Sequence, residues 1–294
     1  MPAIDSLYDP PLWRPPSEGR NLIVQATLGC GFNACAFCGM YRDKTYTQRP
    51  LDDILADLAV LAADRPDATR LFLADGDAYG LPVPVLVDLC DHAARLLPDL
   101  QRVSAYATPF NLLRKTADEI ALLKARRLSL VYVGVESGSD RVLKAIAKGS
   151  RRQMEAGLVR AAEGGLKVSA TVIAGLAGRD GWEEHIEATA DLINRVPPAY
   201  LSTLQLGLDE CARAGFLARM PGFRPQDDGG VLIELRRLVE MLAPPRPVIF
   251  RTNHASNALP LAGTLPKDRG RLLAEIDDAL AGARRLRPAF LRGL

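Results

Sequence analysis

The chain has 294 residues, of which 48% are hydrophobic and 24% charged, and a formal net charge of +2. This length can bury a large core, as one barrel-sized domain or two smaller ones, and the near-neutral charge excludes the basic footprint of a dedicated nucleic-acid binder. No stretch approaches the roughly 18 apolar residues of a membrane span, and residues 1–20 lack the apolar segment of a signal peptide. We therefore expect a cytoplasmic protein with no membrane partner.

Short apolar runs alternate with amphipathic stretches along most of the chain. The predicted strands are 22–27, 70–73, 102–106, 130–134, 167–173 and 200–206. The predicted helices between them are 51–64, 84–97, 117–126, 140–163 and 182–195, and Thr116 with Glu119 predicts a capping box on the third. Because parallel strands need crossovers of about this length, the alternation predicts an α/β fold with a parallel sheet. Periodicity leaves a doubly wound sheet and a complete or partial barrel open.

The pattern is less regular after residue 206. A Gly/Pro-rich loop precedes a predicted helix at 231–242, a predicted strand at 248–252 and a closing helix at 267–286. Of the two isolated cysteines, Cys90 is expected to be a small buried apolar residue, and Cys211 follows the sixth predicted strand.

Three cysteines lie within nine residues, directly after the first predicted strand. Cys30, Cys35 and Cys38 have the spacing C-x4-C-x2-C, and such clustering in a cytosolic protein favours metal binding or catalysis over disulfides. Sites in parallel α/β proteins form at the carboxyl ends of strands. Three thiolates are one fewer than a closed zinc site or a simple ferredoxin cluster uses. The pattern thus indicates an iron–sulfur cluster with one open iron, and its alternatives are a zinc site completed by a distant His, or unligated reactive thiols.

Further motifs that contain polar residues or glycine lie at the ends of the later predicted strands. They are Asp75, Gly76 and Asp77 after the second strand, Glu136 and Ser137 after the fourth, and Ile173 and Gly175 at the fifth. An acid suits an ammonium group and a glycine suits a tight turn. Each motif also has an ordinary structural alternative: an acidic turn, a serine cap on the helix expected at Asp140, or a plain buried strand.

Taken together, these motifs resemble the radical S-adenosylmethionine (SAM) superfamily over about residues 22–206. Its usual signature is C-x3-C-x2-C with an aromatic residue before the last cysteine. Phe37 occupies that place, whereas this chain has one more residue between the first two cysteines. The resemblance implies a partial (β/α)6 barrel of the TIM type at 21–208, preceded by an extended arm at 1–20. A C-terminal extension at 209–294 would complete or cover the active-site cavity.

The resemblance also implies two cofactors and their ligands. A [4Fe–4S] cluster would be held by Cys30, Cys35 and Cys38, with SAM on the open iron and a reducing partner such as flavodoxin or ferredoxin. SAM would be bound by Phe37, by the acidic turn Asp75, Gly76 and Asp77, by Glu136 and Ser137 at the ribose, and by Ile173 and Gly175 at the adenine. Radical SAM enzymes cleave SAM reductively and use the 5′-deoxyadenosyl radical to take hydrogen from a substrate.

Three residues are candidates for the substrate side of the site. Tyr106 ends the third predicted strand, and Arg251 and His254 lie in a dense polar run after an apparent strand. An Arg suits an anionic group and a His transfers protons near neutral pH. The alternative is a loop whose polar groups are satisfied internally.

Three functional hypotheses follow from this pattern. The first is a radical SAM enzyme acting on a small molecule, with nucleic acid an unlikely partner because no RNA-binding appendage is recognisable. The second is radical SAM modification of tRNA or a peptide. The third is a non-catalytic iron–sulfur redox sensor, which would not require Glu136.

Overall fold

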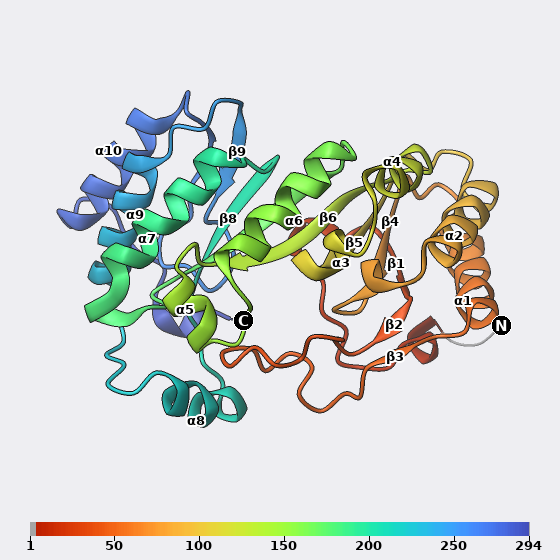
Figure 1. Ribbon diagram of the computed structural model, residues 1–294, viewed down its shortest axis with the longest axis horizontal. Coiled ribbons are helices and arrows are strands. Elements are labelled where there is room, and N and C mark those ends of the chain that lie inside the picture. Colours follow the sequence, from red (N-terminus) through yellow and green to blue (C-terminus); the bar gives the residue numbers. More distant parts are fainter. Residues whose placement is uncertain (1–3, 294) are drawn as a thin grey trace. The chain divides into compact units, whose positions relative to one another are not determined.

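The computed structural model describes residues 4–293, and its contacts divide them into two compact units (Figure 1). The N-terminal unit comprises residues 4–33, 40–133 and 156–168. The C-terminal unit comprises residues 34–39, 134–155 and 169–293.

The N-terminal unit is built on parallel strands that pair in chain order. They are β1 (Leu22–Gln25), β4 (Arg70–Ala74), β5 (Arg102–Ala107) and β6 (Leu128–Glu136), of which β6 ends in the other unit. Most strand residues are buried. Strands covered on both faces are expected to be apolar without alternation, which is why the sequence shows them as short apolar runs.

Helices connect these strands. They are α1 (Leu51–Asp64), α2 (Val83–Leu96), α3 (Pro109–Leu113) and α4 (Ala117–Ala125). Helix α6 (Arg151–Glu163) follows β6; it begins in the C-terminal unit and belongs to the N-terminal unit from Ala156 onward. Helices α1 and α2 pack side by side (Figure 1). The predicted capping box opens α4, where the Thr116 hydroxyl accepts from Glu119 N–H and the Glu119 carboxylate accepts from Thr116 N–H. This prediction is confirmed.

A small antiparallel pair, absent from the sequence prediction, flanks the cysteine loop. Strand β2 (Thr27–Leu28) pairs with β3 (Thr47–Gln48). Short 3-10 turns occur at Ile4–Leu7, Pro16–Glu18, Ala78–Gly80 and Ala289–Leu291. Two-residue strands carry too little periodicity to be read from sequence.

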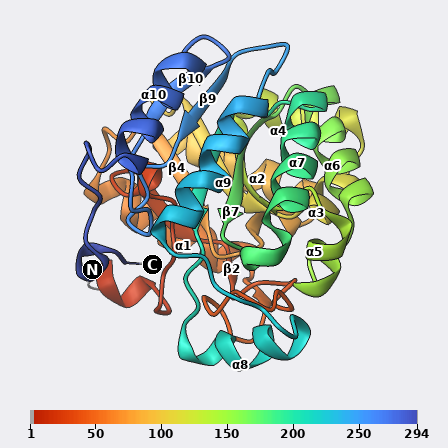
Figure 2. The same cartoon turned by 90° about the vertical axis from the view of Figure 1, so that its left-hand side faces the viewer.

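The C-terminal unit continues the strand–helix alternation. Its strands are β7 (Lys167–Ala174), β8 (Tyr200–Gln205), β9 (Val248–Arg251) and β10 (Ala262–Leu265). Strand β7 begins in the other unit, and β10 is antiparallel to β9. Its helices are α5 (Asp140–Ala145), α7 (Gly178–Arg195), α8 (Glu210–Arg219), α9 (Asp228–Met241) and α10 (Arg269–Leu280). Helix α9 lies between α7 and α10 and packs on both (Figure 2).

The helix expected at 140–163 is a wrong prediction, because the structure has two helices there. Helix α5 ends at Ala145 and α6 begins at Arg151. Between them Ala147 and Gly149 have φ values of 56° and 98°, which an α-helix does not accommodate. Two further elements differ from the prediction. Helix α8 occupies part of the region that the sequence predicts as a loop, and the sequence does not predict strand β10.

The expected fold class is confirmed: the chain is α/β with mostly parallel strands joined by helices, as in partial TIM-type barrels. Within residues 4–293, no helix is both long and apolar enough to cross a membrane. The expected domain division at residues 20 and 208 stays a prediction.

Candidate active site

The cysteine loop begins right after β2 and is shared between the units. Cys30 belongs to the N-terminal unit, and Cys35 and Cys38 belong to the C-terminal unit. Cys35 is buried, while Cys30 and Cys38 are partly exposed. Within the C-terminal unit, Ala36 N–H donates to the Ile146 carbonyl (2.9 Å), so the second half of the loop rests on the end of α5.

The Asp75-Gly76-Asp77 turn contacts the start of this loop. Gly76 N–H donates to the Gly29 carbonyl (3.0 Å), and Gly29 N–H donates to Asp75 Oδ2 (3.1 Å). A Cβ on Gly76 would lie 2.7 Å from the Tyr41 ring and 2.9 Å from Cys30 Cβ. Only glycine therefore fits here, and the predicted SAM motif touches the residues around the first predicted cluster ligand.

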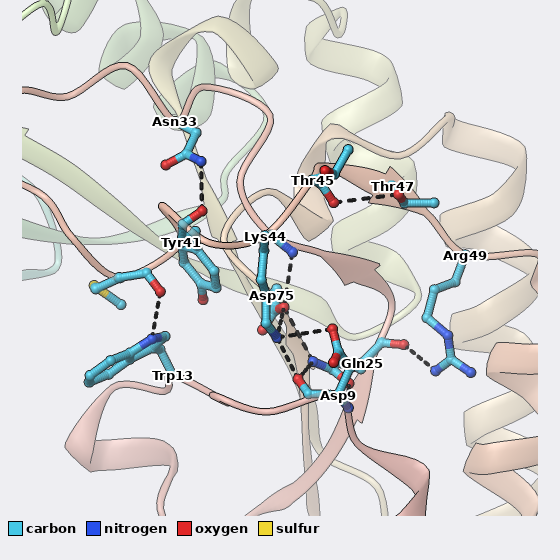
Figure 3. Close-up of polar contacts among 12 residues, drawn as sticks. Asp9, Trp13, Gln25, Asn33, Tyr41, Lys44, Thr45, Thr47, Arg49 and Asp75 are labelled. Carbon is cyan, nitrogen blue, oxygen red and sulfur yellow. Dashed lines mark hydrogen bonds and ion pairs between the residues drawn. The ribbon is translucent and has the colours of Figure 1, made fainter. Parts of the chain in front are cut away.

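The Asp75 carboxyl group is fully buried, and its two oxygens have different surroundings. Oδ2 accepts from Gly29 N–H, from Gln25 Nε2 (3.2 Å) and from Lys44 Nζ (3.3 Å) (Figure 3). Oδ1 is buried with no hydrogen-bond partner among the described residues. Burial raises the pKa of Asp75, and the Gly29 amide and the Lys44 ammonium oppose that shift. An additional cationic donor at Oδ1 would complete the site.

Glu136 ends β6 and belongs to the C-terminal unit. Its backbone φ is 62°, and its buried carboxylate turns back over Gly134, where a Cβ would collide with it. Lys148 Nζ lies 3.2 Å from Glu136 Oε1. Burial raises the pKa of Glu136, and Lys148 opposes that shift. A non-glycine residue in the left-handed region is uncommon and often occurs at functional positions.

Ser137 is already engaged within the C-terminal unit. Its Oγ lies 2.7 Å from His185 Nδ1, and His185 Nε2 lies 3.0 Å from the Ile173 carbonyl. Burial lowers the pKa of His185 to about 4, so the ring is neutral at pH 7. Because a carbonyl only accepts, Nε2 carries the proton and Nδ1 accepts from the Ser137 hydroxyl. A helix cap was considered for Ser137 and Ser139, and it is confirmed for Ser139, which accepts from Val142 N–H.

Gly175 follows β7 with a φ of 82°, and its N–H donates to Glu234 Oε2 (2.7 Å). Glu234 lies on α9, is fully buried, and has a pKa raised to about 7 by burial. Gln226 Nε2 donates to its other oxygen (3.0 Å). Sequence reasoning missed Glu234, although its place among the apolar positions of the helix that follows Asp227 was a usable signal.

The candidate substrate residues lie in different settings. In the N-terminal unit, the Tyr106 ring packs edge-on against Phe72 at 5.3 Å between centroids. In the C-terminal unit, Arg251 is exposed at the end of β9. His254 is half-buried beside Ser256 Oγ (2.9 Å), and burial with nearby Arg287 lowers its pKa. His254 is therefore mainly a neutral base at pH 7.

The remaining predicted residues are placed as follows. Phe37 is partly exposed in the cysteine loop, and Asp77 and Ile173 are buried. Cys90 is buried, as expected, and burial raises its pKa to about 12. Cys211 is exposed on α8, with Sγ 3.1 Å from Asp209 Oδ1.

The donor chemistry of these residues fits the implied cofactors. Three thiolates leave one iron of a [4Fe–4S] cluster open, and Asp75 Oδ1 is a buried acceptor suited to an ammonium group. In the described part of the chain, no three His, Cys, Asp or Glu side chains are grouped as a preformed metal site. Ligation by the three cysteines therefore stays a prediction from their spacing and from family membership.

A mostly parallel α/β fold, with a cysteine loop after β2 and acidic groups after later strands, is typical of cofactor-dependent enzymes of the TIM-barrel type. The family model described as "Radical SAM superfamily" matches residues 24–193. The chain belongs to the radical SAM superfamily, and the predicted enzyme class is confirmed. Its cofactors are accordingly a [4Fe–4S] cluster and SAM.

Two curated relatives show how far the sequence similarity extends. The chain is 29% identical over 275 residues to a tRNA-2-methylthio-N(6)-dimethylallyladenosine synthase of Bordetella petrii, covering 89% of this chain and 52% of the relative. It is 32% identical over 170 residues to the ribosomal protein uS12 methylthiotransferase RimO of Anaeromyxobacter sp., covering 53% of this chain and 34% of the relative. The chain thus spans about half the length of the first relative. These names specify macromolecules, in contrast to the small-molecule expectation.

Solved structures share the fold at low sequence identity. Coproporphyrinogen III oxidase (HemN) from Escherichia coli, a radical SAM enzyme, superposes with a TM-score of 0.57 at 18% identity, over 75% of this chain and 51% of that one. Methylornithine synthase (PylB) superposes with a TM-score of 0.52 at 13% identity, over 76% and 63%. These similarities support the fold alone.

Proposed function

We propose that this chain cleaves SAM reductively and uses the resulting radical to modify a tRNA. The observation that carries the substrate assignment is the similarity, over 89% of this chain, to a synthase that acts on a tRNA nucleoside. The sequence alone favours a small-molecule substrate. The relatives favour the macromolecular alternative over it.

In this proposal, Cys30, Cys35 and Cys38 ligate the cluster as thiolates. A cluster held by these residues would, once reduced, supply the electron for cleavage of the sulfonium of SAM to methionine and a 5′-deoxyadenosyl radical. The protein's part is to bind, orient and shield the reactants, because the cofactor supplies the difficult chemistry.

Buried acceptors of the chain would orient SAM. Asp75 Oδ1 is assigned to the SAM ammonium group, and the support for this is that the oxygen is buried and has no hydrogen-bond partner among the described residues. Glu136 is assigned to the ribose hydroxyls, and Lys148 opposes the burial that raises the pKa of its carboxyl group. A carboxylate held ionised accepts stronger hydrogen bonds than a neutral acid does.

The backbone after β7 is assigned to the adenine. Glu234 accepts the Gly175 N–H and fixes a turn whose φ of 82° suits glycine. Ser137 and Ile173 act indirectly in this scheme, because both bond the buried His185 ring. Their proposed role is to hold the ends of β6 and β7 in place within the C-terminal unit.

A small-molecule substrate is the second candidate. The net charge of +2 favours it, because tRNA binding usually requires a pronounced basic surface. In that case Tyr106, Arg251 and His254 are the first residues to test, Arg251 for an anionic group and His254 as a neutral base.

The test compares substrates in one anaerobic assay. Reconstituted protein is incubated with SAM, dithionite and either unmodified tRNA, ribosomal protein uS12 or a pool of deuterated metabolites. The proposal predicts that tRNA increases 5′-deoxyadenosine formation and yields a nucleoside of altered mass after digestion. Deuterium transfer from a metabolite into 5′-deoxyadenosine, with no effect of tRNA, would establish the second candidate instead.

A further inference from the structure

The cysteine loop is closed at its base by a compact set of contacts in the N-terminal unit. Gly29 precedes Cys30, and Lys44 follows the last residues of the loop. A Cβ on Gly29 would lie 3.2 Å from Lys44 Cβ, so the two ends of the loop are in direct contact. The β2–β3 pair, with Leu28 opposite Thr47, continues this closure.

A buried ion pair joins these two ends to the second predicted motif. Lys44 Nζ lies 3.3 Å from Asp75 Oδ2, and the side chains are 7% and 0% exposed. The same oxygen accepts the Gly29 N–H. The Gly29 carbonyl is held in turn by Gly76 N–H. Both polar groups of the residue preceding Cys30 are thus fixed by the Asp75-Gly76 turn.

Two further residues connect the ion pair with its surroundings (Figure 3). Gln25 Nε2 donates to Asp75 Oδ2 (3.2 Å) and to the Asp9 carbonyl (2.9 Å). Lys44 Nζ also bonds the Asp9 carbonyl and lies 3.5 Å from Asp9 Oδ2. A lysine placed only for solubility would stay in water, because burying an ammonium is costly unless it is paired.

We propose that Lys44 is a positioning residue for the cluster: through Asp75 it fixes Gly29, and thereby the direction in which Cys30 presents its thiolate. This inference rests on the proposed function, in which Cys30 is a cluster ligand. Groups that orient a metal ligand through hydrogen bonds change metal affinity about 10- to 100-fold when they are removed. Neither Lys44 nor Gln25 carries a motif that the sequence would reveal.

The variant Lys44→Met removes the ammonium and keeps most of the stem. Its matched control is Arg102→Met, which removes the cation from another buried pair of the same unit, Arg102 Nη2 to Glu18 Oε1 at 2.8 Å with Glu18 fully buried. Both variants leave a buried carboxylate without its cation. Only Lys44→Met changes a residue at the base of the cysteine loop.

The cluster is reconstituted anaerobically, and its loss to an iron chelator is followed by absorbance. We expect cluster loss about tenfold faster in Lys44→Met, with KM for SAM within about twofold of the wild-type value. Arg102→Met is expected to lose its cluster at the wild-type rate. Lys44→Arg, which retains the cation, is expected to restore part of the difference.

A second measurement uses protein without iron. Hydrogen exchange of a peptide spanning residues 26–33 should become faster in Lys44→Met and stay unchanged in Arg102→Met, because the Lys44 ammonium no longer holds Asp75 Oδ2, the acceptor of the Gly29 amide. Should Lys44→Met fail to fold, Lys44→Gln is measured in the same two experiments, since it removes the charge and keeps a polar end on the side chain.

Three results would overturn the inference: cluster loss at the wild-type rate in Lys44→Met, equal acceleration in both methionine variants, or a raised KM for SAM with normal cluster loss. A wild-type protein that binds no cluster would overturn the proposed function. In that case the exchange experiment still decides whether Lys44 fixes the loop.

Discussion

Replacing Gly76 by alanine is expected to displace the start of the cysteine loop. The added Cβ would lie 2.7 Å from the Tyr41 ring and 2.9 Å from Cys30 Cβ, whereas ordinary contacts begin at 3.4 Å. The ring must therefore retreat by about 0.7 Å and Cys30 by about 0.5 Å. Overpacking of this kind costs about 1–3 kcal/mol of folding stability. The larger effect falls on function, because one of the displaced residues is a predicted cluster ligand.

The assay measures iron content and the initial rate of 5′-deoxyadenosine formation. We expect Gly76→Ala to bind less iron and to turn over at least about tenfold more slowly, in line with the cost of disturbing metal-ligand positions. Gly215→Ala is the control, because its Cβ meets nothing within 4 Å and lies on α8, where alanine is the better helix former. Wild-type iron content and rate in Gly76→Ala would refute the close packing of this turn on Cys30.

Three further substitutions test the C-terminal unit. Glu136→Gln is expected to raise KM for SAM about tenfold, because charge-assisted hydrogen bonds are lost; an unchanged KM contradicts its ribose role. Ser137→Ala is expected to cost about 1–3 kcal/mol of stability, because the buried His185 ring loses its donor, and to leave KM for SAM unchanged; a raised KM would indicate a direct SAM contact. Burial raises the pKa of Glu234 from 4.5 to about 7. Between these pH values the folded chain binds more protons than the unfolded chain. The free energy of unfolding should therefore fall by up to about 3 kcal/mol as pH rises through this range. Thermal unfolding of protein without iron at pH 5 and pH 8 should show a loss of stability that is larger in the wild type than in Glu234→Gln by this amount; equal pH dependence in both would refute it.

The sequence located the strand ends well because burial on both faces leaves a strong signal. The runs that end near Ala74, Glu136 and Ala174 become β4, β6 and β7. The cap at Thr116 was equally readable, because a capping box uses neighbours in sequence. Features that depend on local chemistry were therefore predictable.

Contacts between residues distant in sequence were not predictable in this way. Lys44 and Asp75 are 31 positions apart, and Gly175 and Glu234 are 59 apart. No short sequence pattern identifies either pair of residues as a contact. The break between α5 and α6 was missed for another reason: Ala147 and Gly149 adopt left-handed backbone angles, although alanine ordinarily favours a helix.

The function proposed for this chain depends most directly on whether the three-cysteine loop binds a cluster that cleaves SAM. The decisive measurement is 5′-deoxyadenosine formed by anaerobically reconstituted wild-type protein with SAM and dithionite, set against the Cys38→Ser variant. The account predicts a brown wild-type protein with about four iron atoms per chain that produces 5′-deoxyadenosine, and a variant that produces none. A colourless zinc-binding protein that leaves SAM intact would contradict it.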